Sequence, residues 1–253
     1  MADKDTIYYG LVGYPLGHSF SRKFFNDRFA SEHRNAEYVN FEIPDIEQFP
    51  EAIAKCGNVA GLNVTIPYKK QVIHLLDDMD TAAREMGAVN VIKFVKTIDG
   101  KIRLKGYNSD VIGFCDSIRP MLCAEDRKAL ILGTGGASQA VEYGLKSLGL
   151  QVQFVSRHHS ERAIAYEEIA PEMLTEQYSV IVNCTPLGMF PKVDACPNID
   201  YSLLSSRHLC YDLVYNPEQT LFLRRAAERG ARTKNGLEML HLQALAAWEI
   251  WNK

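Results

Sequence analysis

The chain has 253 residues, of which 47% are hydrophobic and 23% are charged, so it can fold as one large or two modest globular domains. Its formal net charge of -3 gives no electrostatic reason to expect a nucleic acid or an anionic membrane as partner, which leaves a small-molecule substrate. The six cysteines form no C-x-x-C pair, no apolar run is long enough to span a membrane, and the first residues do not resemble a signal peptide, which predicts a cytoplasmic protein with reduced thiols and no metal site.

Apolar, β-rich runs alternate with helical patterns along the whole chain, and this alternation predicts an α/β fold with mostly parallel sheets. Asp80 and Gly87 have the residue types of a helix start and a helix stop, and Asp99-Gly100 has those of a hairpin turn. The elements expected in the first half are a strand at 7–13, a helix after Ser21 through Phe29, a strand at 38–43, a helix ending before Gly57, a strand at 59–66, a short helix between Thr81 and Gly87, and hairpin strands at 90–96 and 102–107.

Lys69 ends the run Asn63-Val64-Thr65-Ile66-Pro67-Tyr68-Lys69, in which an apolar strand leads to a proline. Because proline is tolerated at the first position of a helix, the run predicts a helix start with Lys69 in its first turn. The positive end of the helix dipole would make the Lys69 ammonium lose its proton more easily. With a carboxylate to hold it, such a lysine suits proton transfer, although a surface lysine explains the same residues equally well.

The second half begins with a helix from Asp110 to about Leu122, followed by a polar break at 123–127 and a strand at 128–132. Strand and helix patterns then repeat, which predicts a second domain. Gly236 opens a last helix with apolar residues that can pack back on the first domain. We therefore assign residues 1–109 and 236–253 to one domain and residues 110–235 to a second.

A glycine-rich loop follows the strand at 128–132 and precedes a helical stretch, which is the order that a dinucleotide site requires. Gly133 allows the tight turn, and Gly135 lets the backbone approach a pyrophosphate. Gly136 and Ala137 begin a helix whose amides and positive dipole end face that anion. A purely structural glycine turn is the alternative explanation.

The end of the next strand, at 151–155, normally distinguishes the two nicotinamide cofactors. No acidic residue stands there to accept from a ribose hydroxyl, and Ser156 and Arg157 follow instead. Arg157 can meet a ribose phosphate, with Arg162 closing from the loop, because guanidinium groups match phosphate geometry. These residues favour NADP(H), although Arg162 is equally explained as a solvated charge at a helix start.

Seven widely spaced segments form a set of motifs in a fixed order: residues 13–21, 61–69, 87–90, 108–113, 133–138, 183–189 and 235–243. Together they resemble the shikimate dehydrogenase family, and the resemblance covers nearly the whole chain. The family implies an N-terminal α/β substrate domain, residues 1–109 and 236–253, plus a Rossmann-like NADP-binding domain, residues 110–235, with the active site in the cleft between them. It also implies reduction of 3-dehydroshikimate to shikimate with NADPH, in the pathway to chorismate and the aromatic amino acids.

By matching position, Lys69 and Asp110 resemble the catalytic pair of that family, with Asp110 orienting a proton-donating Lys69. Reduction of a ketone places negative charge on oxygen, which a positioned lysine can neutralise. The remaining matches bind substrate in the family: Ser19 and Ser21 hold the carboxylate, Tyr215 lies near it, and Thr65, Asn90 and Gln243 bind ring hydroxyls.

Structural roles remain open for several of these residues. Ser21 has the residue type of a cap for a helix beginning at Arg22, and Asp110 that of a cap for the next helix. Tyr215 is equally explained as a packed aromatic, and Gln243 as a helix polar group without a ligand.

The chain also departs from the family pattern at Arg22, Val91, Ser109 and Ser156, where the family more often has proline, threonine, threonine and asparagine. The change at Ser156 leaves more of the NADP preference to the two arginines.

Two other functions fit parts of the sequence. One is a quinate/shikimate dehydrogenase of the same shape that uses NAD, which the missing acid after Val155 disfavours. The other is a non-catalytic dinucleotide-binding sensor, since a fold does not prove activity. A sensor has no reason to keep both Lys69 and Asp110. A monomer and a homodimer are both compatible with these features.

Overall fold

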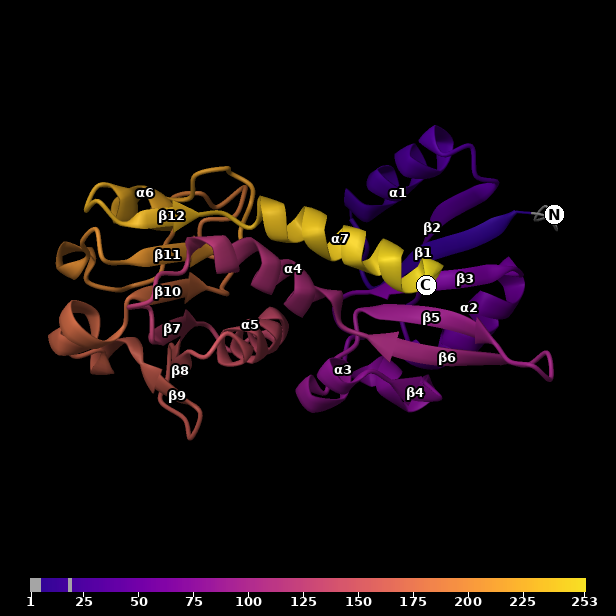
Figure 1. Cartoon of the computed structure of the whole chain (residues 1–253), viewed down its shortest axis with the longest axis horizontal. Helices are drawn as coiled ribbons and strands as arrows, with labels where there is room; N and C mark the ends of the chain where they lie inside the picture. Colours follow the sequence, from indigo (N-terminus) through magenta and orange to yellow (C-terminus); the bar gives the residue numbers. More distant parts are fainter. Residues whose placement is uncertain (1–5, 18–19) are drawn as a thin grey trace. The chain divides into compact units, whose positions relative to one another are not determined.

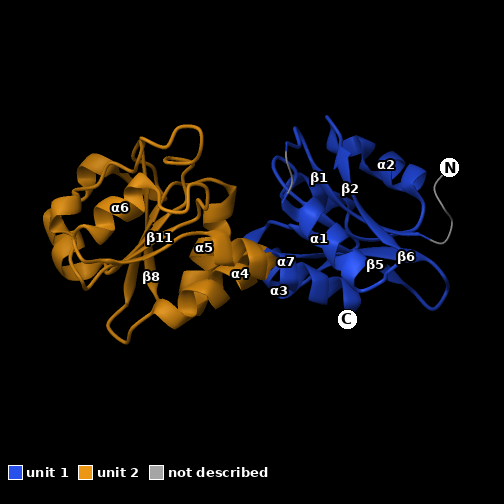
Figure 2. Ribbon diagram, turned by 90° about the horizontal axis from the view of Figure 1, so that it is seen from above, with its two compact units in different colours: residues 1–109, 244–253 blue, residues 110–243 orange. Residues whose placement is uncertain are grey.

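The computed structural model describes residues 6–17 and 20–253. The chain divides into two compact units, residues 1–109 with 244–253 and residues 110–243 (Figure 2). The last helix, α7 (Leu237–Asn252), begins in the second unit and belongs to the first from Ala244 onward, whereas the sequence assigns the whole helix to the first domain. Among the residues that the structure describes, no helix is both long and apolar enough to cross a membrane.

A six-stranded mixed sheet forms the centre of the first unit (Figure 1). Strand β1 pairs in parallel with β2 and β3, whereas β5 runs antiparallel to β3 and β6, so the predicted hairpin is confirmed. The order is β2-β1-β3-β5-β6-β4, with β1 (Ile7–Gly13), β2 (Ala36–Glu42), β3 (Val59–Val64), β4 (Asp78–Met79), β5 (Val91–Lys96) and β6 (Ile102–Tyr107).

Local capping residues set the helix ends of the first unit. The Asp80 side chain accepts a hydrogen bond from the Ala83 amide at 2.8 Å, and Gly87 ends the same helix in the left-handed conformation, at φ 61°. Gly57 ends the preceding α-helix. The helices are α1 (Phe20–Ser31), the 3-10 helix η1 (Ile46–Gln48), α2 (Phe49–Cys56), the 3-10 helix η2 (Gln71–Leu75) and α3 (Thr81–Met86).

The predicted helix start at Pro67 is wrong. The chain after β3 forms turns, and the next helical element, η2, begins only at Gln71. The Tyr68 amide closes a turn by donating to the Thr65 carbonyl at 2.9 Å, and the buried Tyr68 hydroxyl donates to the Ile43 carbonyl at 2.5 Å. Lys69 therefore precedes the helix, and the helix-dipole argument for its proton loses its structural basis.

Aromatic side chains from α1 and α7 pack on one face of the first sheet. Trp251 lies over Gly61 of β3, and its indole donates to the Ile92 carbonyl at 3.1 Å. A β-carbon on Gly61 would lie 2.3 Å from the Trp251 ring, so only glycine permits this approach. The buried aromatic residues of this cluster are Tyr9, Phe25, Phe29, Tyr38, Trp248 and Trp251.

The second unit contains a six-stranded sheet in which every pair is parallel. Its order is β12-β11-β10-β7-β8-β9, with β7 (Lys128–Leu132), β8 (Gln151–Ser156), β9 (Ala163–Ala165), β10 (Val180–Asn183), β11 (Leu209–Asp212) and β12 (Arg232–Lys234). The helices besides α7 are α4 (Ser109–Ile118), η3 (Arg119–Met121), α5 (Gly136–Ser147), η4 (Tyr166–Glu168), the π-helical η5 (Met173–Gln177), η6 (Tyr201–Leu203) and α6 (Leu221–Ala227).

The strand order of the second sheet reverses direction at β7. The chain builds outward from β7 through β8 and β9, then returns to the other side of β7 to build β10, β11 and β12. This is the Rossmann-like order, so the predicted fold class is correct for this unit. In such sheets ligands bind outside the carboxyl ends of the strands at the reversal point, which here is between β7 and β10.

Candidate active site

A pocket of about 480 Å³ lies at the carboxyl ends of β7, β8 and β10 in the second unit. It occupies the reversal point of the sheet, where a dinucleotide is expected. Its lining residues are Gly133, Thr134, Gly135, Ser156, Arg157, Tyr166, Cys184, Thr185, Pro186 and Leu187.

The glycine loop forms the floor of this pocket. Gly133 has φ 101°, and a β-carbon there would lie 2.8 Å from the Thr185 methyl group. A β-carbon on Gly135 would meet no atom within 4 Å, so the backbone is open to a ligand at this position. Gly135 caps α5 without a side-chain hydrogen bond, and Gly136 and Ala137 form the first turn. The positive helix end is therefore suited to a pyrophosphate.

Arg157 and Arg162 have different environments. Ser156 ends β8, and both Ser156 and the exposed Arg157 line the pocket. Arg162 does not line the pocket, because its guanidinium forms an ion pair with Glu142 and lies 4.4 Å from the centre of the Phe154 ring. The geometry therefore supports a ligand role for Arg157 and a structural role for Arg162.

Apart from Thr134 in the glycine loop, two further parts of the pocket lining were not among the residues that the sequence marks as cofactor-binding. Residues 184–187 follow β10, and only the family motif at 183–189 points to them. Tyr166 follows β9, which pairs with β8 so that Ala165 lies opposite Ser156. Nothing in the local sequence marks Tyr166, since its place depends on how the strands are ordered.

Burial changes the acidity of two of these pocket residues. Burial raises the pKa of Tyr166 to about 12, with a smaller contribution from Cys184. The buried Tyr166 hydroxyl has no hydrogen-bond partner in the described part of the chain. Burial also raises the pKa of the Cys184 thiol, so this cysteine is a poor nucleophile.

In the first unit, hydrogen bonds fix the buried side-chain amide of Asn90, one of the predicted substrate-binding residues. Asn90 is 3% exposed and its Nδ2 donates to the Ser109 hydroxyl at 3.1 Å, while the Ser109 amide donates to Asn90 Oδ1 at 2.7 Å. Asn63 Nδ2 donates to the Asn90 carbonyl at 3.4 Å. Thr65 follows directly after β3 and is half-buried.

Tyr38, which the sequence does not single out, joins this group to Ser21. The Tyr38 hydroxyl donates to Asn63 Oδ1 at 2.8 Å and hydrogen-bonds with Ser21. Burial holds the pKa of Tyr38 well above its ordinary value, and the contact with Ser21 opposes this only in part. Ser21 lies inside α1, which begins at Phe20, so it does not cap a helix beginning at Arg22.

The other predicted residues have varied settings. Lys69 is half-buried in the first unit, and Asp110, the second residue of α4, is half-buried in the second. Tyr215 is 43% exposed in the loop after β11, which is not the setting of a packed aromatic. Gln243 is half-buried on α7, where its Nε2 donates to the Leu240 carbonyl at 3.1 Å.

The prediction for Ser19 falls outside the described residues.

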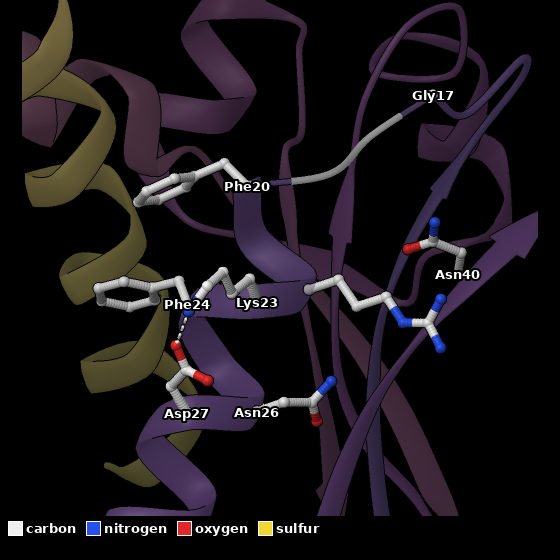
Figure 3. A pocket seen from close by; sticks show the side chains of 8 residues that line it. Gly17, Phe20, Lys23, Phe24, Asn26, Asp27 and Asn40 are labelled. Atoms are coloured by element: carbon white, nitrogen blue, oxygen red, sulfur yellow. Dashed lines mark hydrogen bonds and ion pairs between the residues drawn. The ribbon is translucent and has the colours of Figure 1, made fainter.

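A second pocket, of about 720 Å³, runs along α1, the helix that carries Ser21 (Figure 3). Figure 3 shows Asn40 of β2 across from Phe20 and Phe24, with Lys23 paired to Asp27 at 2.5 Å. Asn40 Oδ1 is buried and has no hydrogen-bond partner in the described part of the chain. The remaining lining residues are Gly17, Arg22 and Asn26.

Comparison with known proteins agrees with both units. Residues 11–92 match the family model for the shikimate dehydrogenase substrate binding domain. The NADP(+) shikimate dehydrogenase of Desulforamulus reducens is 37% identical over 266 residues, which cover 96% of this chain and 88% of that protein.

Solved structures extend the agreement to the whole fold. The structure of shikimate dehydrogenase from Aquifex aeolicus is similar with a TM-score of 0.83 and 34% identity, covering 100% of this chain and 94% of that one. The Thermus thermophilus enzyme in complex with NADP(H) and shikimate is similar with a TM-score of 0.81 and 28% identity, covering 97% of this chain and 93% of that one. With a relative this close over nearly its full length and the same two-unit fold, the chain belongs to the shikimate dehydrogenase family.

Proposed function

We propose that this protein is an NADP-dependent oxidoreductase that reduces 3-dehydroshikimate to shikimate. The observation that carries the cofactor assignment is Arg157, which lines the dinucleotide pocket directly after β8, where no acidic residue stands. A guanidinium at this place can bind the ribose phosphate of NADP. Without an acidic residue, the corresponding ribose hydroxyl of NAD lacks its usual acceptor. Family membership supports the substrate assignment.

Lys69 is the proposed proton donor to the ring ketone. NADPH, when bound, supplies the hydride. As negative charge develops on the ketone oxygen, the Lys69 ammonium would neutralise it and transfer a proton, which typically contributes about 10²–10⁴-fold to the rate. Asp110 would orient the ammonium group and keep it charged.

Short neutral side chains are the proposed substrate ligands. Ser19 and Ser21 would hold the carboxylate, with Tyr215 near it, and Thr65, Asn90 and Gln243 would bind the ring hydroxyls. Support comes from Asn90, because its hydrogen bonds to Ser109 fix the orientation of a buried amide before any ligand arrives. Such preorganisation suits a polyhydroxylated ring, which must be recognised by several hydrogen bonds at once.

The reverse reaction offers a direct test. The purified protein is mixed with shikimate or quinate and with NADP⁺ or NAD⁺, and the absorbance of the reduced cofactor is followed. We expect the fastest turnover with shikimate and NADP⁺. Turnover with quinate and NAD⁺ alone would assign the chain to the quinate branch, and binding of NADP⁺ without any turnover would support a non-catalytic sensor.

A further inference from the structure

Asp212, the last residue of β11, is fully buried and accepts hydrogen bonds from three separate segments. Asn183 Nδ2 donates to its Oδ1 at 2.9 Å, and the Val214 amide donates to the same oxygen at 3.0 Å. Thr220 Oγ1 donates to the other oxygen, Oδ2, at 2.6 Å. Asn183 and Thr220 are fully buried as well, so the carboxyl group is held without access to water.

The first of these contacts reaches the wall of the dinucleotide pocket. Asn183 Oδ1 accepts from the Thr185 amide at 3.0 Å and from the Thr185 hydroxyl at 2.6 Å, and the Leu187 amide donates to that hydroxyl at 3.3 Å. Thr185 and Leu187 both line the pocket, and the Thr185 methyl group packs against Gly133. The place of this wall therefore depends on the orientation of Asn183.

The other contacts hold the loop at residues 213–219. Asp212 binds its beginning through the Val214 amide and its end through Thr220, which also caps α6 by accepting from the Leu223 amide at 3.4 Å. The loop carries Tyr215, and the Asn216 carbonyl accepts from the Phe190 amide at 3.0 Å. One carboxyl group thus joins the pocket wall to the loop after β11.

We propose that Asp212 is a positioning residue for dinucleotide binding. By holding both Asn183 and the loop at residues 213–219, it keeps Thr185 aligned with the glycine loop. The proposal rests on the NADP(H) binding proposed above. It differs from a purely structural role in one measurable respect. Substitution of a purely structural residue lowers only the stability of the fold. Substitution of a positioning residue also weakens ligand binding by the protein that remains folded.

The test compares two buried carboxyl groups of the same unit by alanine substitution. Asp126 is 6% exposed, accepts from the Ser179 hydroxyl at 2.5 Å and from the Cys123 amide at 2.8 Å, and does not line the pocket. Asp126→Ala and Asp212→Ala should both lower the urea midpoint of unfolding. Calorimetric titration of folded protein with NADP⁺ should then show a Kd raised by about 10-fold or more for Asp212→Ala and by less than about 2-fold for Asp126→Ala.

A gentler pair of variants tests the same link if Asp212→Ala does not fold. Thr220→Val removes the hydroxyl that donates to Asp212, whereas Thr220→Ser keeps it. Neither Thr220 nor Asp212 lines the pocket, so a change in binding would not come from a lost direct contact. We expect weaker NADP⁺ binding for the valine variant and nearly normal binding for the serine variant. Equal affinities in this pair, or an unchanged Kd in folded Asp212→Ala, would overturn the positioning role.

The same titrations with NAD⁺ separate this proposal from the cofactor assignment. A wild-type protein that binds NAD⁺ and not NADP⁺ would contradict the NADP assignment, and the Asp212 series would then be judged on NAD⁺. A wild-type protein that binds neither dinucleotide would overturn both proposals.

Discussion

Lys69 lies in a turn after β3, and Lys70 follows it directly in the sequence. These two lysines allow a controlled test of proton donation. Lys69→Ala should lower turnover by about 100-fold or more, because the ketone oxygen loses its proton donor, while NADP⁺ binding remains nearly unchanged. Lys70→Ala, in which an exposed lysine just before η2 is removed, should keep normal turnover. Equal rates for the two variants would remove Lys69 from the mechanism.

Two arginines of one loop give a matched test of cofactor recognition. Arg157→Ala should weaken NADP⁺ binding far more than NAD⁺ binding, because only NADP⁺ carries the ribose phosphate. Arg162→Ala should change neither affinity by more than about 2-fold, since Arg162 is paired with Glu142 and lies outside the pocket lining. Titration of each variant with both dinucleotides measures the effect. A similar loss for both dinucleotides in Arg157→Ala would contradict phosphate recognition.

Tyr38 tests whether the hydrogen bonds behind the substrate-side residues matter for binding. Tyr38→Phe leaves Asn63 Oδ1 without its buried donor and frees Ser21 from its contact. We expect the KM for shikimate to rise by about 5-fold or more with little change in NADP⁺ affinity. Tyr68→Phe is the control, because it removes another buried hydroxyl of the same unit, whose hydrogen bond within the described residues goes to the Ile43 carbonyl. A similar KM in both variants would argue against the link.

At the scale of elements, the contact of α7 with β3 depends on one glycine. Gly61→Ala would place a β-carbon 2.3 Å from the Trp251 ring, which is held among aromatic side chains and by its bond to Ile92. Such overpacking should lower the free energy of unfolding of the first unit by about 1–3 kcal/mol. Gly17→Ala, whose β-carbon meets no atom within 4 Å, is the control.

Tryptophan fluorescence is a suitable probe of this change, because both tryptophans lie in that aromatic cluster. Urea midpoints that agree between the two glycine variants would show that α7 can shift away without loss.

Elements whose signals are local were predicted from the sequence. The caps Asp80 and Gly87 bound α3, and the segments on both sides of Asp99-Gly100 form the predicted hairpin. The helix start at Pro67 was wrong: the chain forms turns there, and the Tyr68 side chain is buried with its hydroxyl bonded to the carbonyl of the distant Ile43. Local propensity cannot contain such a contact.

The candidate site shows the same division between local and distant signals. The glycine loop and Arg157 were identified from a strand, a turn and a helix in sequence order, and they line the pocket. Tyr166 was missed because it reaches the pocket only through the pairing of β8 with β9. The sequence left Arg162 open between a phosphate ligand and a solvated charge. In the structure it pairs with Glu142 of α5, a partner that sequence order does not bring next to it.

At the scale of the molecule, two buried groups of the second unit make its stability depend on pH in opposite directions. Burial lowers the pKa of His208, whose Nδ1 accepts from the Ser205 amide at 3.0 Å and whose Nε2 donates to the Leu174 carbonyl at 2.8 Å. The folded state therefore favours neutral His208, and its contribution to stability is lost as the pH falls below about 6.5.

Asp212 has the opposite effect. Burial raises its pKa to about 6, against the opposing hydrogen bonds from Thr220, Val214 and Asn183. The folded state therefore favours the protonated carboxyl group, so the contribution of Asp212 to stability is complete below about pH 4 and is lost as the pH rises through about 6. Burial and, to a smaller extent, the charge of Asp212 raise the pKa values of the Cys184 and Cys210 thiols, which therefore stay neutral throughout this range.

Asp212→Asn isolates this second effect. An asparagine stays neutral at every pH and can still accept from Asn183 and Val214, while its amide can donate to Thr220. Relative to wild type, the variant should therefore gain up to about 3 kcal/mol of stability between pH 4 and pH 7, because a pKa raised by about two units corresponds to that energy. Since His208 is present in both proteins, its contribution cancels in the difference.

Urea unfolding followed by far-UV circular dichroism measures this difference, because tryptophan fluorescence reports on the first unit only. A stability difference that stays constant from pH 4 to pH 7 would mean that the carboxyl group is already ionised at the lower pH. The buried network around Asn183 and Thr220 would then stabilise a charge at Asp212.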